Sequence, residues 1–559
     1  MIQNHVSLLI LLIYILLTSC TNAPSSEPIA DQTRDPAETN WNNATIYFLM
    51  TDRFYNGNVS NDYEHTGDNP PAPFRGFMGG DIAGITAKLN EGYFTDLGVT
   101  AIWMTPLVEQ ISGSVDEGTG NSFPFHGYWA RDWTAIDKRF GTKDELKEMV
   151  NAAHDAGIKV LFDVVANHIG PVTETDPVWP DSWVKTGPRC QYQDYKSTTD
   201  CTLVDNLPDI RTESMVEVEL PPYLIEKWTA EGRLDQEVEE LDQWFVETGY
   251  PRTAVNYILK WLVDFIKEYG IDGFRVDTVK HTEEYVWTNL WNSATTAYEE
   301  YKSAHPSGRI SDEPFYMVGE VYNYYISGGR AYDFGDQKVD YFDHGFHALI
   351  NFDFKTDATK SYEAIFSKYD GLLSGDLSGK SVVNYISSHD DGGPYDLTRK
   401  NPMDAGTKLL LCPGAVQIYY GDESARSLTV DAEGDATLRS FMNWDEVADG
   451  TLINGFKRKD VLAHWQKLGT FRREHPSVGT GRHQMLKSSP YTFSRSSTAH
   501  DDRVIVSLNH SGKKKKIEAR SQFSNGMQLY DYYSEQVVTV EDGIVELESA
   551  YDIVLLGRR

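Results

Sequence analysis

Basic residues are scarce in this chain compared with acidic ones. Its 559 residues include 51 Lys and Arg against 83 Asp and Glu, which gives a formal net charge of -32. Such a charge repels a phosphate backbone, so we expect no nucleic acid among its partners. The length exceeds one compact domain, and with 40% hydrophobic residues the chain has ample core material. We therefore expect one large unit and at least one smaller one.

The chain also begins without a long hydrophobic span. The apolar run from Val6 to Leu17 is too short to cross a bilayer comfortably. It leads into Leu17-Thr18-Ser19-Cys20, which is typical of a lipid-modification box. We predict a lipoprotein signal peptide over residues 1–20, lipidation at Cys20 and a flexible polar tether over residues 21–40. The alternatives are an ordinary cleaved signal peptide and an uncleaved anchor. The prediction implies an exported, membrane-anchored lipoprotein, periplasmic or on the cell surface.

Cysteine is rare, with four residues in the whole chain. Cys190 and Cys201 flank a short polar loop, and in an exported protein a disulfide closing that loop is the favoured interpretation. Such a bridge stabilises by roughly 3 kcal/mol. Cys412 lies in an apolar run and is interpreted as a small buried hydrophobe without chemistry.

Short β-type runs alternate with helical patterns along most of the chain, which predicts an α/β fold, a (β/α)8 TIM barrel. Residues 143–157 and 256–270 carry apolar residues at helical spacing and end in glycine, as expected for outer helices. The predicted strands are the runs at 44–50, 99–104, 159–165, 273–276, 315–319, 347–352, 381–386 and 415–420.

Two segments interrupt or follow this pattern. Residues 168–252, after the third strand, are too long for an ordinary loop and predict an inserted subdomain. Residues 478–559 show short alternating runs that predict a C-terminal antiparallel β-sandwich. The barrel would then comprise residues 41–167 and 253–477. We interpret the four lysines at 513–516 as a solvated hairpin turn.

Acidic residues follow several of the predicted strands. Strand alternation puts Arg275 and Asp277 on one side, where the guanidinium favours an ionised carboxylate suited to nucleophilic attack. Glu320 follows an apolar strand, a setting that holds a carboxyl group protonated, as a general acid requires. Asp390, after His389, adds a third acidic group. Taken singly, the alternatives are a structural ion pair for Asp277 and a solvated rim carboxylate for Glu320.

The sequence islands that hold these residues resemble those of glycoside hydrolase family 13, the α-amylase family. The islands are DVVANH (163–168), GFRVDTVKH (273–281), GEV (319–321) and SSHD (387–390), and the resemblance runs from about Trp41 to the end. Within the family, the periplasmic α-amylases of Gram-negative bacteria are the most similar group. They share the patterns FHGYWARDW (125–133), LPDIRTES (207–214), FDHGFHALINFDF (342–354) and PGAVQIYYGDES (413–424).

The resemblance implies a role for each site residue. Asp277 would be the nucleophile, Glu320 the acid/base and Asp390 the carboxylate that grips sugar hydroxyls. Arg275 would orient Asp277. The other residues implied to contact substrate are Tyr128, which would stack on the sugar, His168 and His389 beside the scissile bond, and Lys280 and His281 on the leaving side.

The same resemblance implies calcium as a cofactor, and hard oxygen ligands suit this ion. A first site would use Asn167, Asp209 and the carbonyl of His281, tying the inserted subdomain to the barrel. A second, amino-terminal site is implied by Asn56, Asn58, Asn61, Asp62, Gly79 and Asp81. A hydrogen-bonded turn at Asn167 and an Asx-rich turn at the second group are the alternatives.

These features predict an endo-acting retaining α-1,4-glucan hydrolase that cleaves starch and maltodextrins through a covalent glycosyl-aspartate intermediate. The alternatives are a cyclomaltodextrinase or glucanotransferase of the same family and a non-catalytic starch-binding lipoprotein. The expected partner is an α-glucan polysaccharide or oligosaccharide. We expect a monomer that contacts a membrane only through its N-terminal lipid.

Overall fold

The structure, a computed structural model, describes residues 40–65, 69–306 and 312–559. The predicted signal peptide, the lipidation site Cys20 and all of the predicted tether except Asn40 lie outside the described residues. Within the described ranges, no helix combines the length and the apolar character needed to cross a membrane.

Eight parallel strands close into a barrel in the order β1-β16-β15-β14-β11-β10-β7-β2. Each strand lies inside one of the eight runs predicted from the sequence, so the (β/α)8 fold is confirmed. Nearly every barrel-strand residue is buried, as expected for a parallel sheet covered by helices. The bounds are β1 (Thr45–Leu49), β2 (Ala101–Met104), β7 (Lys159–Val164), β10 (Gly273–Val276), β11 (Tyr316–Gly319), β14 (Ala348–Asn351), β15 (Ser381–Asn384) and β16 (Ala415–Tyr419).

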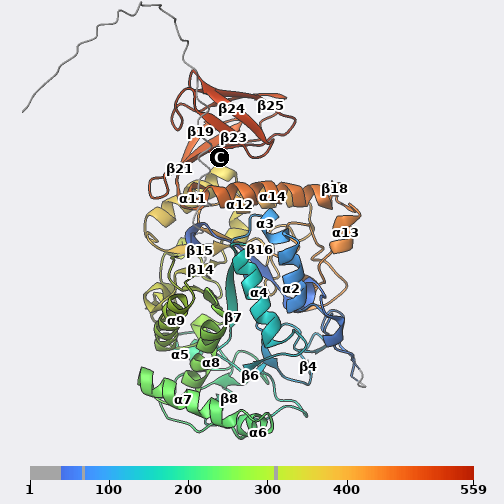
Figure 1. Cartoon of the computed structure of the whole chain (residues 1–559), viewed down its shortest axis with the longest axis vertical. Helices are drawn as coiled ribbons and strands as arrows, with labels where there is room; N and C mark the ends of the chain where they lie inside the picture. Colours follow the sequence, from blue (N-terminus) through green and yellow to red (C-terminus); the bar gives the residue numbers. More distant parts are fainter. Residues whose placement is uncertain (1–39, 66–68, 307–311) are drawn as a thin grey trace, which may run out of the picture. The chain divides into compact units, whose positions relative to one another are not determined.

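Helices cover the outside of the barrel (Figure 1). In α4, Thr142 and Glu145 form a capping box at the start. Helix α8 ends at Gly270, whose φ of 77° favours glycine, and a Cβ there would lie 2.2 Å from the ring of Tyr301. The longer barrel helices are α2 (Ile82–Asn90), α4 (Lys143–Asp155), α8 (Ala254–Tyr269), α9 (Glu284–Ala304), α11 (Tyr362–Ser374), α12 (Pro402–Leu410) and α14 (Arg458–Glu474).

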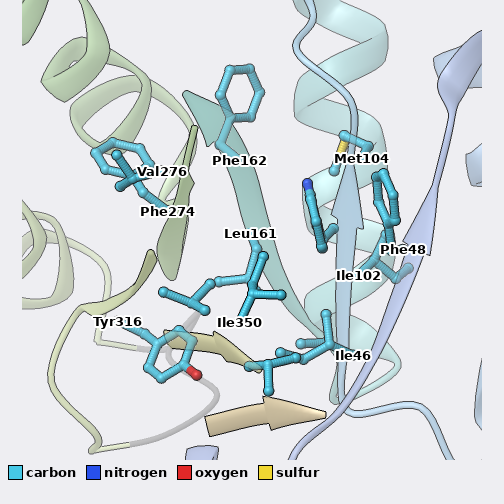
Figure 2. Packing of buried hydrophobic residues seen from close by; sticks show 14 of the residues in the cluster. Ile46, Phe48, Ile102, Met104, Leu161, Phe162, Phe274, Val276, Tyr316 and Ile350 are labelled. Atoms are coloured by element: carbon cyan, nitrogen blue, oxygen red, sulfur yellow. The ribbon is translucent and has the colours of Figure 1, made fainter. Parts of the chain in front are cut away.

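Side chains alternate between the barrel interior and the helix-facing side of each strand. Phe162 of β7 stacks on Phe265 of α8 with ring centroids 4.6 Å apart, so it faces outward. Inside the barrel, Phe48 stacks on Trp103 at 3.7 Å. Figure 2 shows these apolar residues on neighbouring strands, among them Phe48, Phe162 and Phe274. The same alternation leaves the next inward positions free to carry polar groups.

The segment between β7 and α8 contains three helices and one antiparallel pair of short strands. Trp183 and Trp228 of this segment pack against Trp261 of α8, with ring centroids 6.2 and 6.0 Å away. Cys190 and Cys201 are joined by the expected disulfide. The elements are β8 (Val184–Lys185), α5 (Lys196–Thr199), β9 (Asp209–Ile210), α6 (Pro222–Ala230) and α7 (Leu234–Thr248).

An antiparallel sheet of eight strands follows the barrel, in the order β19-β20-β21-β26-β23-β24-β25-β22. Ile505 and Ile517, from the third and the last strand of this order, share one buried cluster, so the sheet folds over its own core. The bounds are β19 (Arg482–Ser488), β20 (Tyr491–Ser497), β21 (Asp502–Leu508), β22 (Lys514–Glu518), β23 (Gln528–Asp531), β24 (Gln536–Glu541), β25 (Ile544–Glu548) and β26 (Val554–Gly557).

The interpretation of the lysine run as a hairpin turn is wrong. Lys514–Glu518 form strand β22, which pairs with β25. Lys515 alternates inward with Ile517 and is only 2% exposed. Its ammonium group donates to the carbonyl oxygens of His510 and Gly512, which makes the burial of a charge tolerable.

Short elements build the loops at the ends of the barrel. They are the helices α1 (Thr51–Phe54), α3 (Tyr93–Asp96), α10 (Phe354–Asp357), α13 (Trp444–Ala448) and α15 (Ser477–Thr480), the 3-10 turns η1 (Trp41–Asn43), η2 (Val59–Asn61), η3 (Val279–His281), η4 (Ile326–Gly328), η5 (Tyr341–His344) and η6 (Gly434–Leu438), and the two-stranded pairs β3 (Val108–Gln110) with β6 (Ala130–Ile136), β4 (Val115–Asp116) with β5 (Asn121–Ser122), β12 (Tyr332–Asp333) with β13 (Lys338–Val339) and β17 (Leu452–Ile453) with β18 (Phe456–Lys457).

Candidate active site

The three predicted acidic residues line one cavity at the carboxyl ends of the barrel strands. Asp277 directly follows β10, Glu320 directly follows β11, and Asp390 comes from the loop after β15. The cavity has a volume of about 560 Å³. Loops at this end of a parallel barrel carry the chemistry of barrel enzymes, because all strands direct their carboxyl ends there.

Arg275 holds two of these carboxyl groups together. Its Nη1 lies 2.7 Å from Oδ1 of Asp277 and its Nη2 lies 3.1 Å from Oε2 of Glu320. Arg275 itself is 1% exposed. A buried guanidinium with two carboxyl partners stays charged, and it fixes both groups beside each other.

The two carboxyl groups differ in their protonation. Burial alone would raise the pKa of Asp277, but the charges of Arg275 and His168 outweigh it, so the pKa lies below the usual range. Burial raises the pKa of Glu320 well above its ordinary value, and the negative charges of Asp277 and Asp390 add to this. A carboxyl group with a lowered pKa and one with a raised pKa therefore face the same cavity, the combination that acid–base and nucleophilic chemistry uses.

The backbone after the nucleophile candidate is also specialised. Thr278 has a φ of 49°, in the left-handed region that a threonine seldom adopts. In this conformation its backbone N–H donates to Oε2 of Glu320 at 3.0 Å. The turn thus directs a main-chain donor at the acid candidate.

Three of the predicted substrate residues gather on one side of the carboxyl groups. The ring of Tyr128 stacks on His389 with centroids 5.3 Å apart. Nε2 of His168 lies 3.1 Å from the carbonyl oxygen of Tyr128. Nδ1 of His168 is buried and has no hydrogen-bond partner within residues 40–65, 69–306 and 312–559. A group with a missing partner beside the acids is available to a ligand.

Lys280 and His281 lie on the cavity wall itself. Nζ of Lys280 donates to the carbonyl oxygen of Tyr322 at 3.0 Å and contacts the hydroxyl of Tyr332 at 3.1 Å. Burial lowers the pKa of Lys280 to about 8. Nδ1 of His281 contacts the carbonyl oxygen of Thr198, which lies in the loop closed by the disulfide. The inserted segment therefore contributes directly to this wall.

The residues predicted for the first calcium site lie together. Nδ2 of Asn167 donates to Oδ2 of Asp209 at 3.1 Å, and Oγ1 of Thr282 lies 3.3 Å from Oδ1 of Asn167. Burial raises the pKa of Asp209 to about 7. Its Oδ1 is buried without a hydrogen-bond partner in the described part of the chain. An unpaired buried carboxylate oxygen beside amide and hydroxyl oxygens fits a hard cation.

The six residues predicted for the second calcium site fall into two sets, those with unpaired oxygens or close contacts and those with structural partners. Asn56 donates to Oδ1 of Asp62 at 2.8 Å, and a Cβ at Gly79 would lie within 2.7 Å of both side chains. The Oδ1 atoms of Asn56 and Asn61 are buried without partners among the residues that the structure describes.

Asn58 and Asp81 of the same group have structural partners. Asn58 caps η2 and donates to Glu145, and Asp81 accepts from the backbone of Gly57, Asn58 and Gly84. Asn56, Asn61, Asp62 and Gly79 therefore fit a cation better than the other two do. No group of three or more His, Cys, Asp and Glu side chains suited to a metal occurs in the described ranges, so either site depends on amide and carbonyl oxygens.

The sequence interpretation missed several groups that the structure places at the site. Asp163 pairs in register with Arg275 and touches it at 2.8 Å. Arg439 donates to the carbonyl oxygen of His389 at 2.9 Å and pairs with Asp435 at 2.6 Å. Strand alternation could have identified Asp163, because this residue lies near the end of the neighbouring strand β7. Arg439 follows irregular chain after β16, where no periodic signal exists.

Fold and site together are those of a barrel enzyme with acidic groups in the cavity at the carboxyl ends of its strands. The family model for the α-amylase catalytic domain matches residues 48–450. The periplasmic α-amylase of Escherichia coli strain K12 is 34% identical over 534 residues, which cover 85% of this chain and 73% of that protein. The chain therefore belongs to the α-amylase family of glycoside hydrolases.

Two further relatives extend the comparison. A cyclomaltodextrin glucanotransferase of Thermoanaerobacterium thermosulfurigenes is 26% identical over 503 residues, 87% of this chain and 62% of that protein. The crystal structure of an α-amylase from Geobacillus thermoleovorans, solved with acarbose, has a TM-score of 0.64 at 22% identity and covers 93% of this chain and 100% of that one. The last likeness supports the fold alone.

Proposed function

We propose that the protein is an endo-acting, retaining α-1,4-glucan hydrolase that cleaves starch and maltodextrins. The observation that carries this proposal is the arrangement of Asp277 and Glu320 on the guanidinium of Arg275, one ionised and one protonated. Membership of the α-amylase family supports the substrate class.

In the proposed reaction, Oδ of Asp277 attacks the anomeric carbon while Glu320 protonates the departing glycosidic oxygen. This forms a covalent glycosyl-aspartate. Glu320, now a carboxylate, then takes a proton from water, which displaces Asp277 and restores the α anomer by a second inversion. Direct attack requires the two carboxyl groups to lie about 5 Å apart.

The remaining site residues are proposed to hold the sugar rings. Asp390 would accept hydrogen bonds from sugar hydroxyl groups beside the scissile bond, and His389 and His168 would hydrogen-bond to the same sugar. Tyr128 would stack on the ring that becomes attached to Asp277. Lys280 and His281 would meet the sugar that leaves. Both line the cavity, where Lys280 contacts Tyr322 and Tyr332.

Calcium is proposed as a structural cofactor. Asn167, Asp209 and the carbonyl of His281 would hold one ion, and the unpaired oxygen of Asp209 supports this. A second ion would be held by the loop containing Asn56, Asn61, Asp62 and Gly79. When bound, the first ion would tie the inserted segment to the barrel strand that carries Asn167.

The division of the chain is likewise a proposal. Residues 41–167 and 253–477 would form the catalytic barrel, 168–252 the inserted subdomain and 478–559 a separate C-terminal domain. We further propose that the protein is exported, carries a lipid at Cys20 and is a monomer. The periplasmic location named for the Escherichia coli relative supports export.

A glucanotransferase or cyclomaltodextrinase is the second candidate. The leaving-side wall carries Tyr192, Tyr322 and Tyr332, and exposed aromatic rings favour the binding of an incoming sugar in place of water. The relative from Thermoanaerobacterium thermosulfurigenes is named for such a transfer. A non-catalytic binding protein is disfavoured, because it would have no need of all three carboxyl groups.

Incubation of the purified protein with amylose, pullulan, maltoheptaose and cyclodextrins tests the proposal, with products resolved by chromatography and their anomeric form followed by NMR. We expect α-configured linear maltooligosaccharides from amylose. Cyclic products or elongated chains would favour the transferase. No product from any of these substrates would contradict both enzymes.

A further inference from the structure

One buried carboxylate at the site has no role in the reaction described above. Asp163 lies near the end of β7 and pairs in register with Arg275 of β10. It is 2% exposed and does not line the cavity. Both of its carboxylate oxygens already accept from protein donors, so we expect it to act through those residues.

Asp163 accepts from three side chains that come from three different parts of the chain. Its Oδ1 accepts from Nη1 of Arg275 at 2.8 Å. Its Oδ2 accepts from Nε1 of Trp103 at 2.9 Å and from the hydroxyl of Tyr128 at 2.8 Å. Strand β2, strand β10 and the loop before β6 thus meet at one carboxylate.

Two of these donors belong to the proposed catalytic machinery. The Nη1 atom that Asp163 binds is the same atom that lies 2.7 Å from Oδ1 of Asp277. The Tyr128 hydroxyl that donates to Asp163 belongs to the ring that stacks on His389. Since Arg275 is a long side chain with several rotamers, a third carboxyl partner beside Asp277 and Glu320 limits where the guanidinium can lie.

We propose that Asp163 is a positioning residue of the reaction, which fixes Arg275 between Asp277 and Glu320 and fixes the ring of Tyr128 against His389. This inference rests on the proposed glucan hydrolysis.

An amide at position 163 cannot replace the carboxylate. The carboxylate oxygens accept all three donors, whereas Asn offers one oxygen and an NH2 group that would face a donor. Asp163→Asn therefore leaves at least one of Arg275, Trp103 and Tyr128 without its partner. The geometry changes although the shape of the side chain does not.

The substitution also removes a negative charge from a crowded cluster. The titratable and charged groups that face Asp277 and Glu320 are Arg275, His168, His281, His389, Asp390, Lys280, Tyr128, Tyr322 and, through Arg275, Asp163. Without Asp163, the charge of Arg275 acts on Asp277 and Glu320 alone. The ionised form of Glu320 then becomes easier to reach, so the alkaline limb of kcat/KM, which reports loss of the Glu320 proton, moves to lower pH.

The barrel offers a matched control. Asp272 precedes β10 at the other end of the strand, is also 2% exposed and also accepts from three groups. These are the hydroxyl of Tyr298 at 3.0 Å, the backbone N–H of Val160 at 2.8 Å and the ring of His154 at 2.9 Å. Asp272→Asn therefore removes an equally buried carboxylate without touching the site.

The experiment compares wild type, Asp163→Asn and Asp272→Asn on maltoheptaose across the pH range, with unfolding followed in denaturant. We expect kcat of Asp163→Asn to fall about 100-fold with KM changed less than about threefold, since misplaced groups cost this much. Its alkaline limb should move by about one pH unit to lower pH. Asp272→Asn should lose stability only, with kcat and the pH profile of its folded fraction unchanged.

Other outcomes separate the two claims. A wild-type protein that cleaves no α-glucan overturns the proposed function. An active wild type with an Asp163→Asn variant of normal kcat, or with reduced kcat but an unshifted limb, overturns the positioning role alone. If Asp163→Asn does not fold, Trp103→Phe removes one donor and keeps the charge. We expect a measurable fall in its kcat, of about tenfold at most. An unchanged kcat in that folded variant would overturn the role.

Discussion

The two ends of the barrel treat buried charge in opposite ways. At the carboxyl end, one guanidinium serves Asp163, Asp277 and Glu320, so acidic groups outnumber the cation that faces them. At the amino end, Asp272 meets His154, a backbone N–H and a tyrosine hydroxyl, and every oxygen has a donor. The cluster at the carboxyl end shifts the pKa values of its acidic groups at a cost in stability. The cluster around Asp272 contributes to stability and takes no part in the reaction.

The junction between the barrel and the C-terminal sheet resembles the amino end. Asp502 of β21 accepts from His475 at 2.9 Å and from the backbone N–H of Ser477 at 2.9 Å. Arg472 of α14 donates to the carbonyl oxygens of Asn43, Leu410, Cys412 and Gly414. Away from the cavity, Asp502 and Arg472 thus have hydrogen-bond partners for their charged groups, as expected for residues with a structural role.

The largest effect is expected from removing the reactive groups. Glu320→Gln and Asp277→Asn should each lower kcat by about 10³-fold or more, because each deletes a proton donor or a nucleophile. The unfolding free energy should change little in Glu320→Gln, where a neutral amide replaces a protonated side chain. It should fall in Asp277→Asn, because buried Arg275 loses a charged partner. Steady-state kinetics and denaturant unfolding measure the two effects. Near-normal turnover in either pure variant contradicts its assigned role.

The opposite pattern is expected at the amino end. Asp272→Asn leaves buried His154 without its charged partner and should lower the unfolding free energy by about 3 kcal/mol. Turnover per folded molecule should stay at the wild-type value. Urea unfolding monitored by tryptophan fluorescence, with an active-site titration, gives both numbers. An equal loss of turnover and stability would remove the contrast between the two ends.

Calcium removal should have a smaller effect on stability. If the ion is present at about 100 times its dissociation constant, it stabilises the folded state by about 2.7 kcal/mol. Calorimetry before and after chelation should show a lower Tm, restored by added calcium. In Asp209→Asn the chelation effect should shrink, whereas Asp62→Asn isolates the amino-terminal loop. An unchanged wild-type Tm after exhaustive chelation contradicts both sites.

The smallest effect is expected from titrating a single pair at the amino end. The pKa of His154 is raised, because the charge of Asp272 overcomes the opposing effect of burial. A raised folded pKa gives stability that is fully present below the unfolded value of about 6.5 and is lost as pH rises through the folded value. Unfolding free energy should therefore fall on the alkaline side in wild type and stay flatter in His154→Gln. Equal slopes in the two proteins would show that His154 titrates without energetic consequence.

The barrel was predictable because its strands are buried on both faces. Such strands appear as continuous apolar runs, and the residue after each run falls at the same end of the barrel. Asp277 and Glu320 could therefore be placed together from the sequence. The Cys190–Cys201 disulfide was predictable for a different reason, since the two cysteines flank a short loop in a chain predicted to be exported.

Other features depend on contacts that no local pattern reports. The contact of Asp163 with Arg275 requires the register of two strands separated by the whole insertion. Arg439 reaches His389 from a loop without periodicity. Lys515 was misjudged because its charge suggested solvent, whereas the alternation with Ile517 placed it inside and two carbonyl oxygens met its ammonium group.

The left-handed turn at Thr278 has an evolutionary consequence. Because the donor to Glu320 is a main-chain N–H, no exchange of the side chain at this position deletes it, and proline alone lacks the atom. A saturation library at residue 278 should accordingly tolerate many replacements, with glycine and asparagine adopting the bend most readily. Sequence drift at this position would then preserve the main-chain hydrogen bond to Glu320.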